Sequence, residues 1–448
     1  MRARARRSLA LGLVMTCLAA LPGDAREVWR SGDAYLDLGG YVREIAFVSR
    51  GTSEADFEAG FGVGCVLSPQ AFANCPAFDA VGLERVGTST TRLRLRMEAR
   101  ANEHWSAVIS VDNELIAGTL DTFEAQLGEN LGTGTWADAS GFEGGDRVGW
   151  AYSLYRGYLN FESEHFEAVV GRQRIPWGVG RLWNPIDRFN AIRPLAIQPD
   201  ESPGVDAINA RILFTDFTQL ELVFAAGRDS SQNDYAMRFQ GMARDIDYGV
   251  VLGSFKGART VGLDLSGNVG EAAGRAEIVY TVPTGDVWPV GAAGPARLAD
   301  FWQIVVSMDY NIDWGTGVYV LAEHLYNGNA LGFGFGKAGP LLGFFEQTTA
   351  PRFYEATSYT RFGGSQVITR SSQLTGLQAG YEITPEIRFN AMILYDWDGE
   401  SAVFFPSLVY SPGSWFDWTL GVQAAAGGKY SEFGDAPTTG FLVGNFYF

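Results

Sequence analysis

Apolar and polar side chains alternate with a period of two along much of this chain. In residues 386–397 every odd position is apolar or aromatic, whereas the even positions include Arg388, Asn390 and Asp396. Residues 300–311 show a similar alternation. Because successive side chains of a strand point to opposite faces, the pattern predicts β-strands with one apolar face.

The predicted strands are separated by gaps of two kinds. About eighteen segments, each of roughly ten to thirteen residues, are long enough for a tilted strand to cross a bilayer. They are expected at residues 34–49, 90–102, 105–117, 150–162, 165–175, 204–215, 218–228, 234–244, 246–255, 259–268, 274–283, 300–311, 316–327, 372–383, 386–397, 401–411, 415–427 and 438–448. Long gaps near 50–89, 118–149, 176–203, 284–299 and 328–371 all follow odd-numbered strands, and the connections after even-numbered strands are short. One end of the structure should therefore have tight turns and the other long loops.

This division of the connections distinguishes a barrel from a soluble β-sandwich, which also alternates. We predict an all-β fold: a transmembrane, antiparallel up-and-down β-barrel of roughly 16 to 18 strands, with long extracellular loops and short periplasmic turns. The mature chain has no apolar run of about eighteen residues, which excludes helical membrane spans. The final strand ends on the aromatic Phe448. That ending resembles the signal by which bacterial outer-membrane barrels are recognised, and it implies the barrel-assembly machinery as a partner.

The N-terminus has the layout of a secretory signal. Four arginines between positions 2 and 7 precede an apolar run from Leu9 to Leu21, and small residues follow up to Ala25. We expect residues 1–25 to be removed and residues 26–448 to form the barrel. The formal net charge is -17 for the whole chain. An exported, acidic chain is a poor binder of nucleic acid, since phosphate contacts need a basic face.

Two cysteines remain after cleavage of the signal, Cys65 and Cys75. They lie in one predicted loop and face an oxidising compartment, so a disulfide between them is expected. A metal site is the poorer interpretation because no histidine or third thiol is near.

Residues 171–203 are the most unusual stretch of the chain. Four prolines from Pro185 to Pro203, together with Pro176, remove ladder donors and interrupt the strand pattern. The segment also concentrates cations, tryptophans and acids. Its candidate solute-binding residues are Arg172, Gln173, Arg174, Trp177, Arg181, Trp183, Asp187 and Arg188. Long ordered loops inside regular scaffolds are often functional. We expect residues 176–203 to fold inward, although the same charges would also suit a loop that is merely fixed to the wall.

A second candidate site is a ladder of arginines. Arg92, Arg94 and Arg96 alternate with apolar residues, so their side chains share one face of a strand. Charges on the lipid face are strongly unfavourable, and this face should therefore line the lumen. A row of arginines opposite acidic residues orients polar solutes and favours anions. The alternative is that the ladder only pairs with acids on neighbouring strands.

Catalytic chemistry is poorly represented. Of the three histidines, His104 and His165 fall in predicted periplasmic turns and His324 stands alone in a strand. They form neither a triad nor a metal site. We predict that the protein is not an enzyme and needs no metal or cofactor.

The motif Gly171-Arg172-Gln173, with Trp177-Gly178 and then Asn184-Pro185 and Asp187, resembles a pattern of uncharacterised bacterial outer-membrane barrels. It is similar, more loosely, to alginate-export barrels and to substrate-selective porins. The match covers about twenty residues and supports a class rather than a substrate. In the alginate-export type, an arginine-rich lumen conducts an acidic polysaccharide, and the arginines of this chain are compatible with that function.

The combined prediction is a bacterial outer-membrane channel of the porin kind. It would pass small polar or anionic solutes through a lumen narrowed by residues 176–203, in contact with membrane lipid and lipopolysaccharide. The alternative is a non-conducting scaffold whose loops bind a polymer or a partner, including a role in polysaccharide export.

Overall fold

The computed structural model describes residues 26–50, 85–118, 140–144, 148–190, 194–197, 204–227, 233–255, 258–283, 300–330, 367, 369–428, 431–434, 436 and 438–448. These residues form twenty β-strands and no helix. Accordingly, none of them belongs to a helix that is long and apolar enough to cross a membrane. The expected signal sequence, Cys65 and Cys75 lie outside the described residues, as do most of the expected loops at 118–149 and 328–371.

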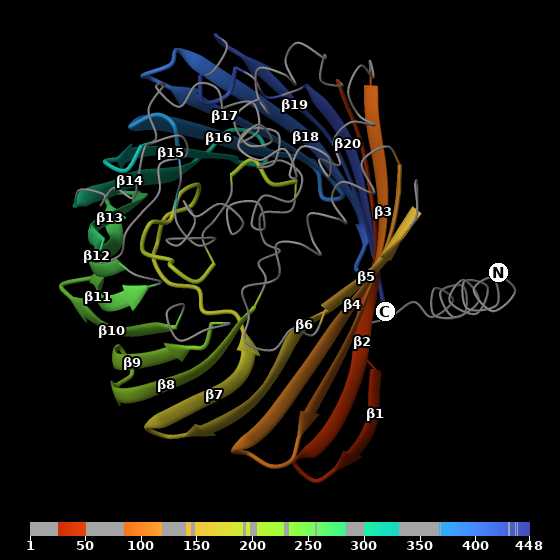
Figure 1. Ribbon diagram of the computed structural model, residues 1–448, viewed down its shortest axis with the longest axis vertical. Coiled ribbons are helices and arrows are strands. Elements are labelled where there is room, and N and C mark those ends of the chain that lie inside the picture. Colours follow the sequence, from red (N-terminus) through yellow and green to blue (C-terminus); the bar gives the residue numbers. More distant parts are fainter. Residues whose placement is uncertain are drawn as a thin grey trace, which may run out of the picture.

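Eighteen of the strands close into an antiparallel barrel (Figure 1). They are β2 (Ala34–Arg50), β3 (Arg85–Arg100), β4 (Trp105–Gly118), β6 (Val148–Ser163), β7 (Phe166–Gln173), β8 (Val205–Thr215), β9 (Thr218–Ala225), β10 (Asp234–Ala243), β11 (Ile246–Phe255), β12 (Ala258–Val269), β13 (Ala272–Pro283), β14 (Phe301–Ile312), β15 (Val318–Asn327), β16 (Gln373–Thr384), β17 (Ile387–Asp396), β18 (Ser401–Gly413), β19 (Phe416–Ala426) and β20 (Thr439–Tyr447). The predicted fold class and the upper end of the predicted strand range are confirmed.

The first and last barrel strands close the sheet. β20 pairs with β2 from Tyr41 opposite Tyr447 to Ser49 opposite Thr439. The backbones of Gly40 and Phe448 exchange hydrogen bonds of 2.8 and 3.0 Å beyond that ladder. Each of the eighteen described barrel strands thereby has a hydrogen-bonded neighbour on both sides, as a sheet in lipid requires.

Two further strands lie beside the barrel strands. β1 (Arg26–Ser31) pairs with residues 34–38 of β2, where β20 no longer accompanies it. β5 (Ser140–Gly144) pairs with residues 149–153 of β6, beyond the last contact of β6 with β7. β7 has only eight residues, whereas β6 has sixteen. β5 therefore pairs with β6 where β7 has left the wall, and the sequence pattern did not predict either extra strand.

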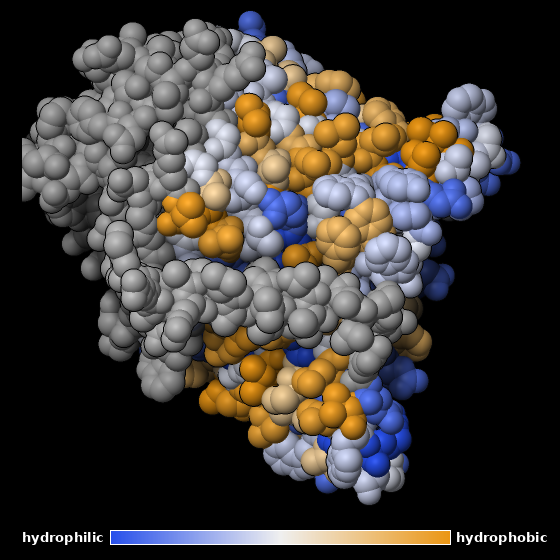
Figure 2. Space-filling model, turned by 90° about the vertical axis from the view of Figure 1, so that its right-hand side faces the viewer, coloured by the Kyte–Doolittle hydropathy of each residue, from blue (hydrophilic) through white to orange (hydrophobic). Residues whose placement is uncertain are grey.

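The two faces of each strand differ in chemistry. On β14 the outer side chains of Trp302, Val306 and Met308 are about half exposed, whereas Gln303 and Ser307 on the other face are buried. This is the reverse of a soluble protein and matches a lipid-facing exterior around a polar interior. Figure 2 shows apolar side chains spread over one outer face, with hydrophilic residues gathered at its lower end.

Tight turns join the strands at one end, as the gap pattern predicted. β10 and β11 are connected by Arg244 and Asp245, whose φ angles are 52° and 65°. Two successive residues with positive φ are typical of a type I′ turn, whose twist matches that of the flanking strands. The two ends of the barrel therefore differ: short turns join the strands at this end, and the long connections lie at the other.

Candidate functional site

Residues 174–190 and 194–197 lie inside the barrel (Figure 1). We use the term insert for residues 176–203, of which 176–190 and 194–197 are described. Its apolar side chains join two clusters of buried residues with the inner wall. Trp177, Ile186 and Phe189 pack with residues of β8, β9, β11 and β13, whereas Leu182 and Trp183 pack with residues of β14 to β18. The described part of the insert therefore packs against the inner wall, while its action as a constriction stays a prediction.

Two wall carboxylates hold the backbone of the insert. Glu277 on β13 accepts hydrogen bonds from the backbone N–H groups of Val179, Gly180 and Ile186, at 2.6, 2.7 and 3.0 Å. Glu323 on β15 accepts three more, at 2.8, 2.8 and 2.7 Å, from the backbone at positions 181 to 183. Both side chains are almost fully buried. Charge-assisted bonds of this kind are stronger than neutral ones, and here they satisfy six N–H groups of an irregular segment.

Two tight backbone positions allow the insert to reach these carboxylates. Gly178 has a φ of 82°, and a Cβ atom there would lie 2.1 Å from Oδ1 of Asn184. At Gly180 a Cβ atom would lie 1.9 Å from the carbonyl oxygen of Trp183. Only glycine fits either position without displacing backbone or a buried side chain.

Side chains of the insert complete the attachment. The indole of Trp177 donates to Glu221 on β9 at 2.8 Å, and its ring meets Phe189 edge-on at 5.2 Å. Arg188 donates to Thr281 on β13 and to Gln303 on β14, at 2.9 and 3.1 Å. The backbone of the insert is also held at its far end, where Gln423 donates to the carbonyl of Leu195 at 2.7 Å.

Asp187 and Arg188 are charged groups buried at the centre of the insert. Burial raises the pKa of Asp187 to about 7, although backbone N–H groups of Asn190 and Phe189 and the charge of Arg174 act in the opposite direction. Burial likewise lowers the pKa of Arg188 to about 10, against the charges of Glu277 and Asp187. Nε and Nη1 of Arg188 have no hydrogen-bond partner among the described residues. Asp187 itself shapes the chain, because Oδ1 accepts from the backbone at positions 189 and 190.

The residues before the insert end β7 and orient its departure. Arg172 donates to both carboxylate oxygens of Asp206 on β8, at 2.8 and 3.0 Å, and to the carbonyl of Leu154 on β6 at 3.0 Å. The amide of Gln173 donates to the carbonyls of Val169 and Ala207. Arg172 and Gln173 are both buried. Their polar groups therefore tie three adjacent strands together where the chain leaves the wall.

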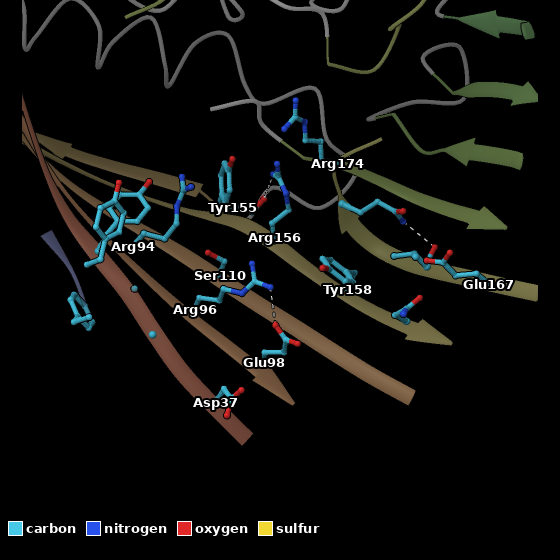
Figure 3. A pocket seen from close by; sticks show the side chains of 18 of the residues that line it. Asp37, Arg94, Arg96, Glu98, Ser110, Tyr155, Arg156, Tyr158, Glu167 and Arg174 are labelled. Atoms are coloured by element: carbon cyan, nitrogen blue, oxygen red, sulfur yellow. Dashed lines mark hydrogen bonds and ion pairs between the residues drawn. The ribbon is translucent and has the colours of Figure 1, made fainter. Parts of the chain in front are cut away.

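A cavity of about 800 Å³ lies in the lumen against β2 to β8 (Figure 3). Its lining is charged and aromatic, with Arg94, Arg96, Arg156, Arg174 and Arg211 facing Asp37, Glu98 and Glu167, and with Tyr41, Tyr155, Tyr158 and Tyr447 between them. The arginines outnumber the carboxylates on this lining. Such a surface can hold an anionic or dipolar solute through the planar donor edges of its guanidinium groups.

The arginine ladder of β3 forms one wall of this cavity. Arg92 pairs with Glu114 at 2.6 Å, and Arg94 makes two bonds to Asp112 at 2.6 and 2.7 Å. Arg96 pairs with Glu98 at 2.9 Å, and its side chain is half exposed. Each of the three arginines therefore has an acidic partner on β3 or β4, and a paired guanidinium keeps other N–H groups.

The structure divides the predicted site residues into two groups. Arg94, Arg96, Gln173 and Arg174 line the cavity, with Arg92 beside them on the ladder. Trp177, Trp183, Asp187, Arg188 and Arg172 are buried in contacts of the insert or the wall. Arg174 and Arg181 are exposed side chains, and neither has a carboxylate within ion-pair distance among the described residues. Trp177 and Trp183 therefore pack against wall strands, and neither ring lines the cavity.

Sequence reasoning missed several residues of the site. Tyr155, Arg156 and Arg211 line the cavity, and Glu277 and Glu323 anchor the insert. One signal was present for Arg156: the polar positions of 150–162 change parity, from Ser153 to Arg156, as happens when a strand contains one extra residue. Nothing in the local sequence distinguishes the two glutamates.

The histidines lie away from the cavity lining. His104, in the turn after β3, is near the carbonyl of Glu162 at 2.9 Å. His324 on β15 is exposed and contacts Thr375 on β16 at 2.9 Å. Neither forms part of the lumenal site, and the described residues contain no cluster of metal-ligating side chains.

A closed barrel of 18 strands with an apolar exterior and a charged, partly filled lumen defines an outer-membrane protein of the porin type. Solved structures share this fold. The barrel is similar to OccAB1 of Acinetobacter baumannii, with a TM-score of 0.53 and 8% identity over 96% of this chain and 99% of that chain. It is also similar to OccAB2 of the same organism, with a TM-score of 0.51 and 10% identity over 92% of this chain and 98% of that one.

OprD from Pseudomonas aeruginosa was also found, with a TM-score of 0.48 and 10% identity over 96% of both chains. No family model matches the sequence, and no curated protein is similar to it in sequence. The comparisons therefore establish the fold of an outer-membrane porin, while the alginate-export resemblance stays a prediction.

Proposed function

We propose that the protein is a passive outer-membrane channel for small polar or anionic solutes and has no enzymatic activity. The observation that carries the proposal is the lumenal cavity, where Arg96, Arg174 and the other lining arginines exceed the carboxylates around them. An excess of fixed positive charge in a low-dielectric lumen raises the local concentration of anions. Lipopolysaccharide and the barrel-assembly machinery would be the partners of such a channel.

The insert would act as the constriction of this channel. It fills the side of the lumen next to β9 and β11 to β19, and leaves the cavity on the side of β2 to β8. Because six backbone bonds and two apolar clusters hold it, a fixed narrowing is favoured over a loop that swings during each passage event. Solutes would then pass along the arginine ladder, with Arg174 and Arg181 presenting further positive charge.

The test is ion selectivity of the purified, refolded barrel in a planar bilayer. Wild type should show steady conductance with preference for anions, and the triple variant Arg92/Arg94/Arg96→Ala should lose that preference because Asp112 and Glu114 would then be uncompensated. A second variant, Arg174→Ala, removes one cavity cation without breaking an ion pair of the described residues. The control is Arg244→Ala, since Arg244 lies exposed in a turn.

Two results would contradict the proposal. One is the absence of conductance from a barrel that still migrates as a folded, heat-modifiable species in electrophoresis, which would favour a scaffold that binds a polymer or partner through its loops. The other is a conducting wild type whose selectivity is the same in the triple variant and in Arg244→Ala.

A further inference from the structure

The wall of the cavity contains a β-bulge at Tyr155. Ser110 on β4 is opposite Arg156 on β6, whereas the next residue, Val111, is opposite Leu154. Tyr155 is therefore an extra residue in β6 that has no partner in the register. In a regular strand, neighbouring side chains point to opposite faces. Here Tyr155 and Arg156 are consecutive and both line the lumenal cavity.

The bulge places the ring of Tyr155 between two guanidinium groups (Figure 3). The Cζ atom of Arg94 lies 3.3 Å from the ring centroid, and that of Arg156 lies 3.9 Å from it. Arg94 is also 5.1 Å from the ring of Tyr41, which in turn lies 4.6 Å from Arg43. Cations and rings thus alternate along this wall. Guanidinium groups favour such stacking because the ring face carries negative charge density.

Buried contacts on the far side hold the bulge in place. Arg172 donates to the carbonyl of Leu154, immediately before Tyr155, and is itself fixed by two bonds to Asp206. A Cβ atom on Gly204 would lie 3.1 Å from both the carbonyl oxygen of Tyr155 and Nη1 of Arg156. The Arg156 side chain also donates to the carbonyl of Tyr155 at 2.7 Å. The position of the Tyr155 ring is therefore imposed by the backbone and not by its own side-chain torsions alone.

Stacking controls what a guanidinium can offer to a solute. When a ring covers its face, the N–H donors remain at the edge of the plane, where they suit the coplanar oxygens of a carboxylate or similar oxyanion. The ring also lies between two positive groups that would otherwise repel each other. Arg94 already donates one edge to Asp112, at 2.6 and 2.7 Å, so the ring positions the rest of its guanidinium group. Without the ring, Arg94 and Arg156 would both lose the stacking contact that keeps them at the cavity lining, and less positive charge would face the cavity.

We propose that Tyr155 is a selectivity-determining residue of the channel, because its ring holds the stacked guanidinium groups of Arg94 and Arg156 at the cavity lining. The inference rests on the proposed channel function and extends it to a residue that carries no charge. It assigns the bulge of β6 a role in selectivity: the extra residue brings a tyrosine and an arginine to the same face. The hydroxyl group is not part of this role, since the contacts are made by the ring.

The experiment compares two substitutions of similar size in the full-length barrel. Tyr155→Phe keeps the ring, whereas Tyr155→Leu keeps much of the apolar volume and removes the quadrupole. The reversal potential across a salt gradient gives the ratio of anion to cation permeability. We expect Tyr155→Phe to match wild type and Tyr155→Leu to lower the ratio by about threefold, although neither variant changes the formal charge. The variant Arg156→Lys should resemble Tyr155→Leu, because an ammonium group stacks less well and has no planar donor edge.

Each outcome is interpretable once folding has been checked by heat-modifiable migration. Equal permeability ratios in Tyr155→Phe and Tyr155→Leu, with a conducting and anion-selective wild type, would overturn the inference and leave the channel proposal intact. A parallel loss in both variants would also overturn it, because the hydroxyl group or the packing would then be responsible. A wild type that does not conduct would instead contradict the proposed function itself.

Discussion

Removal of the Glu277 carboxylate is the most direct perturbation of the insert. This side chain accepts three backbone N–H groups, from positions 179, 180 and 186, and has no exposed surface. In Glu277→Ala the three donors lose their acceptor. An unsatisfied buried donor costs about 1–3 kcal/mol, so the docked insert should be destabilised by about 3 kcal/mol or more. That corresponds to a shift of roughly a hundredfold in the balance between docked and released insert.

The second carboxylate limits the effect. Glu323 still binds three N–H groups of the neighbouring residues, and Leu182 and Trp183 remain in their apolar cluster. Glu277→Ala should therefore release the insert transiently, whereas a double variant with Glu323→Ala should release it for longer. Glu277→Gln should lie between wild type and Glu277→Ala, since its carbonyl oxygen can still accept from two donors while its amide faces a third.

Two assays report this release. Single-channel recordings should show a larger mean conductance with frequent transitions between levels. Limited trypsin digestion should cut faster after Arg181, which is exposed but fixed by its neighbours in wild type. Glu386→Ala is the matched control, because Glu386 is exposed in the turn after β16 and bonds to Thr384 instead of to the insert. Wild-type conductance together with a wild-type cleavage rate in Glu277→Ala would refute the idea that these bonds hold the insert.

Further predictions follow from the same contacts. Gly180→Ala should disrupt the insert more than Gly440→Ala disturbs its strand, because a Cβ atom at position 440 meets nothing within 4 Å; digestion rates would compare them, and equal rates would contradict the prediction. Arg172→Lys should lower the thermal midpoint of the barrel by removing a bidentate pair that is worth about 1.5–3 kcal/mol, and an unchanged midpoint would show that the pair contributes little. The raised pKa of Asp187, about 7, means that protons bind more tightly in the folded state, so its contribution to insert stability is largest below the unfolded value near 3.8 and declines as pH rises to about 7. In Asp187→Asn this decline in stability should be absent when thermal unfolding is measured between about pH 4 and 7.5. A pH dependence equal to that of wild type would refute the prediction.

The barrel was predictable because its information is local. Alternation within ten residues specifies a strand and its inner face, and the lengths of successive gaps specify the two ends. The ladder of Arg92, Arg94 and Arg96 could be placed on one face for the same reason. Strand ends were less accurate. β3 begins at Arg85 rather than at residue 90, since ladder bonds to β2 continue beyond the alternating region.

The anchoring of the insert was not predictable from local pattern. Glu277 and Glu323 lie 98 and 142 residues along the chain from the N–H groups that they bind at positions 179 and 181. In the sequence each is one more inward-facing acid on a strand, like Asp264 or Asp309. Their role depends on which strands face the insert across the lumen, and that is fixed only when β20 closes on β2. The same reason explains why the local sequence could not show that Trp177 and Trp183 pack against the wall strands.

The insert and the cavity depend on one another through Arg172. Its guanidinium group ties the last residues of β7 to Asp206 and to Leu154, so the point where the chain leaves the wall is also the point where β6 bulges. The departure of β7 gives the insert its starting position, and the bulge turns Tyr155 and Arg156 toward the cavity. A change in Arg172 should therefore alter both stability and selectivity, whereas a change in Glu277 should alter the constriction while leaving the stacked arginines in place. If stability and selectivity both change in the Arg172 variant, whereas only the constriction changes in the Glu277 variant, then Arg172 positions both the insert and the cavity.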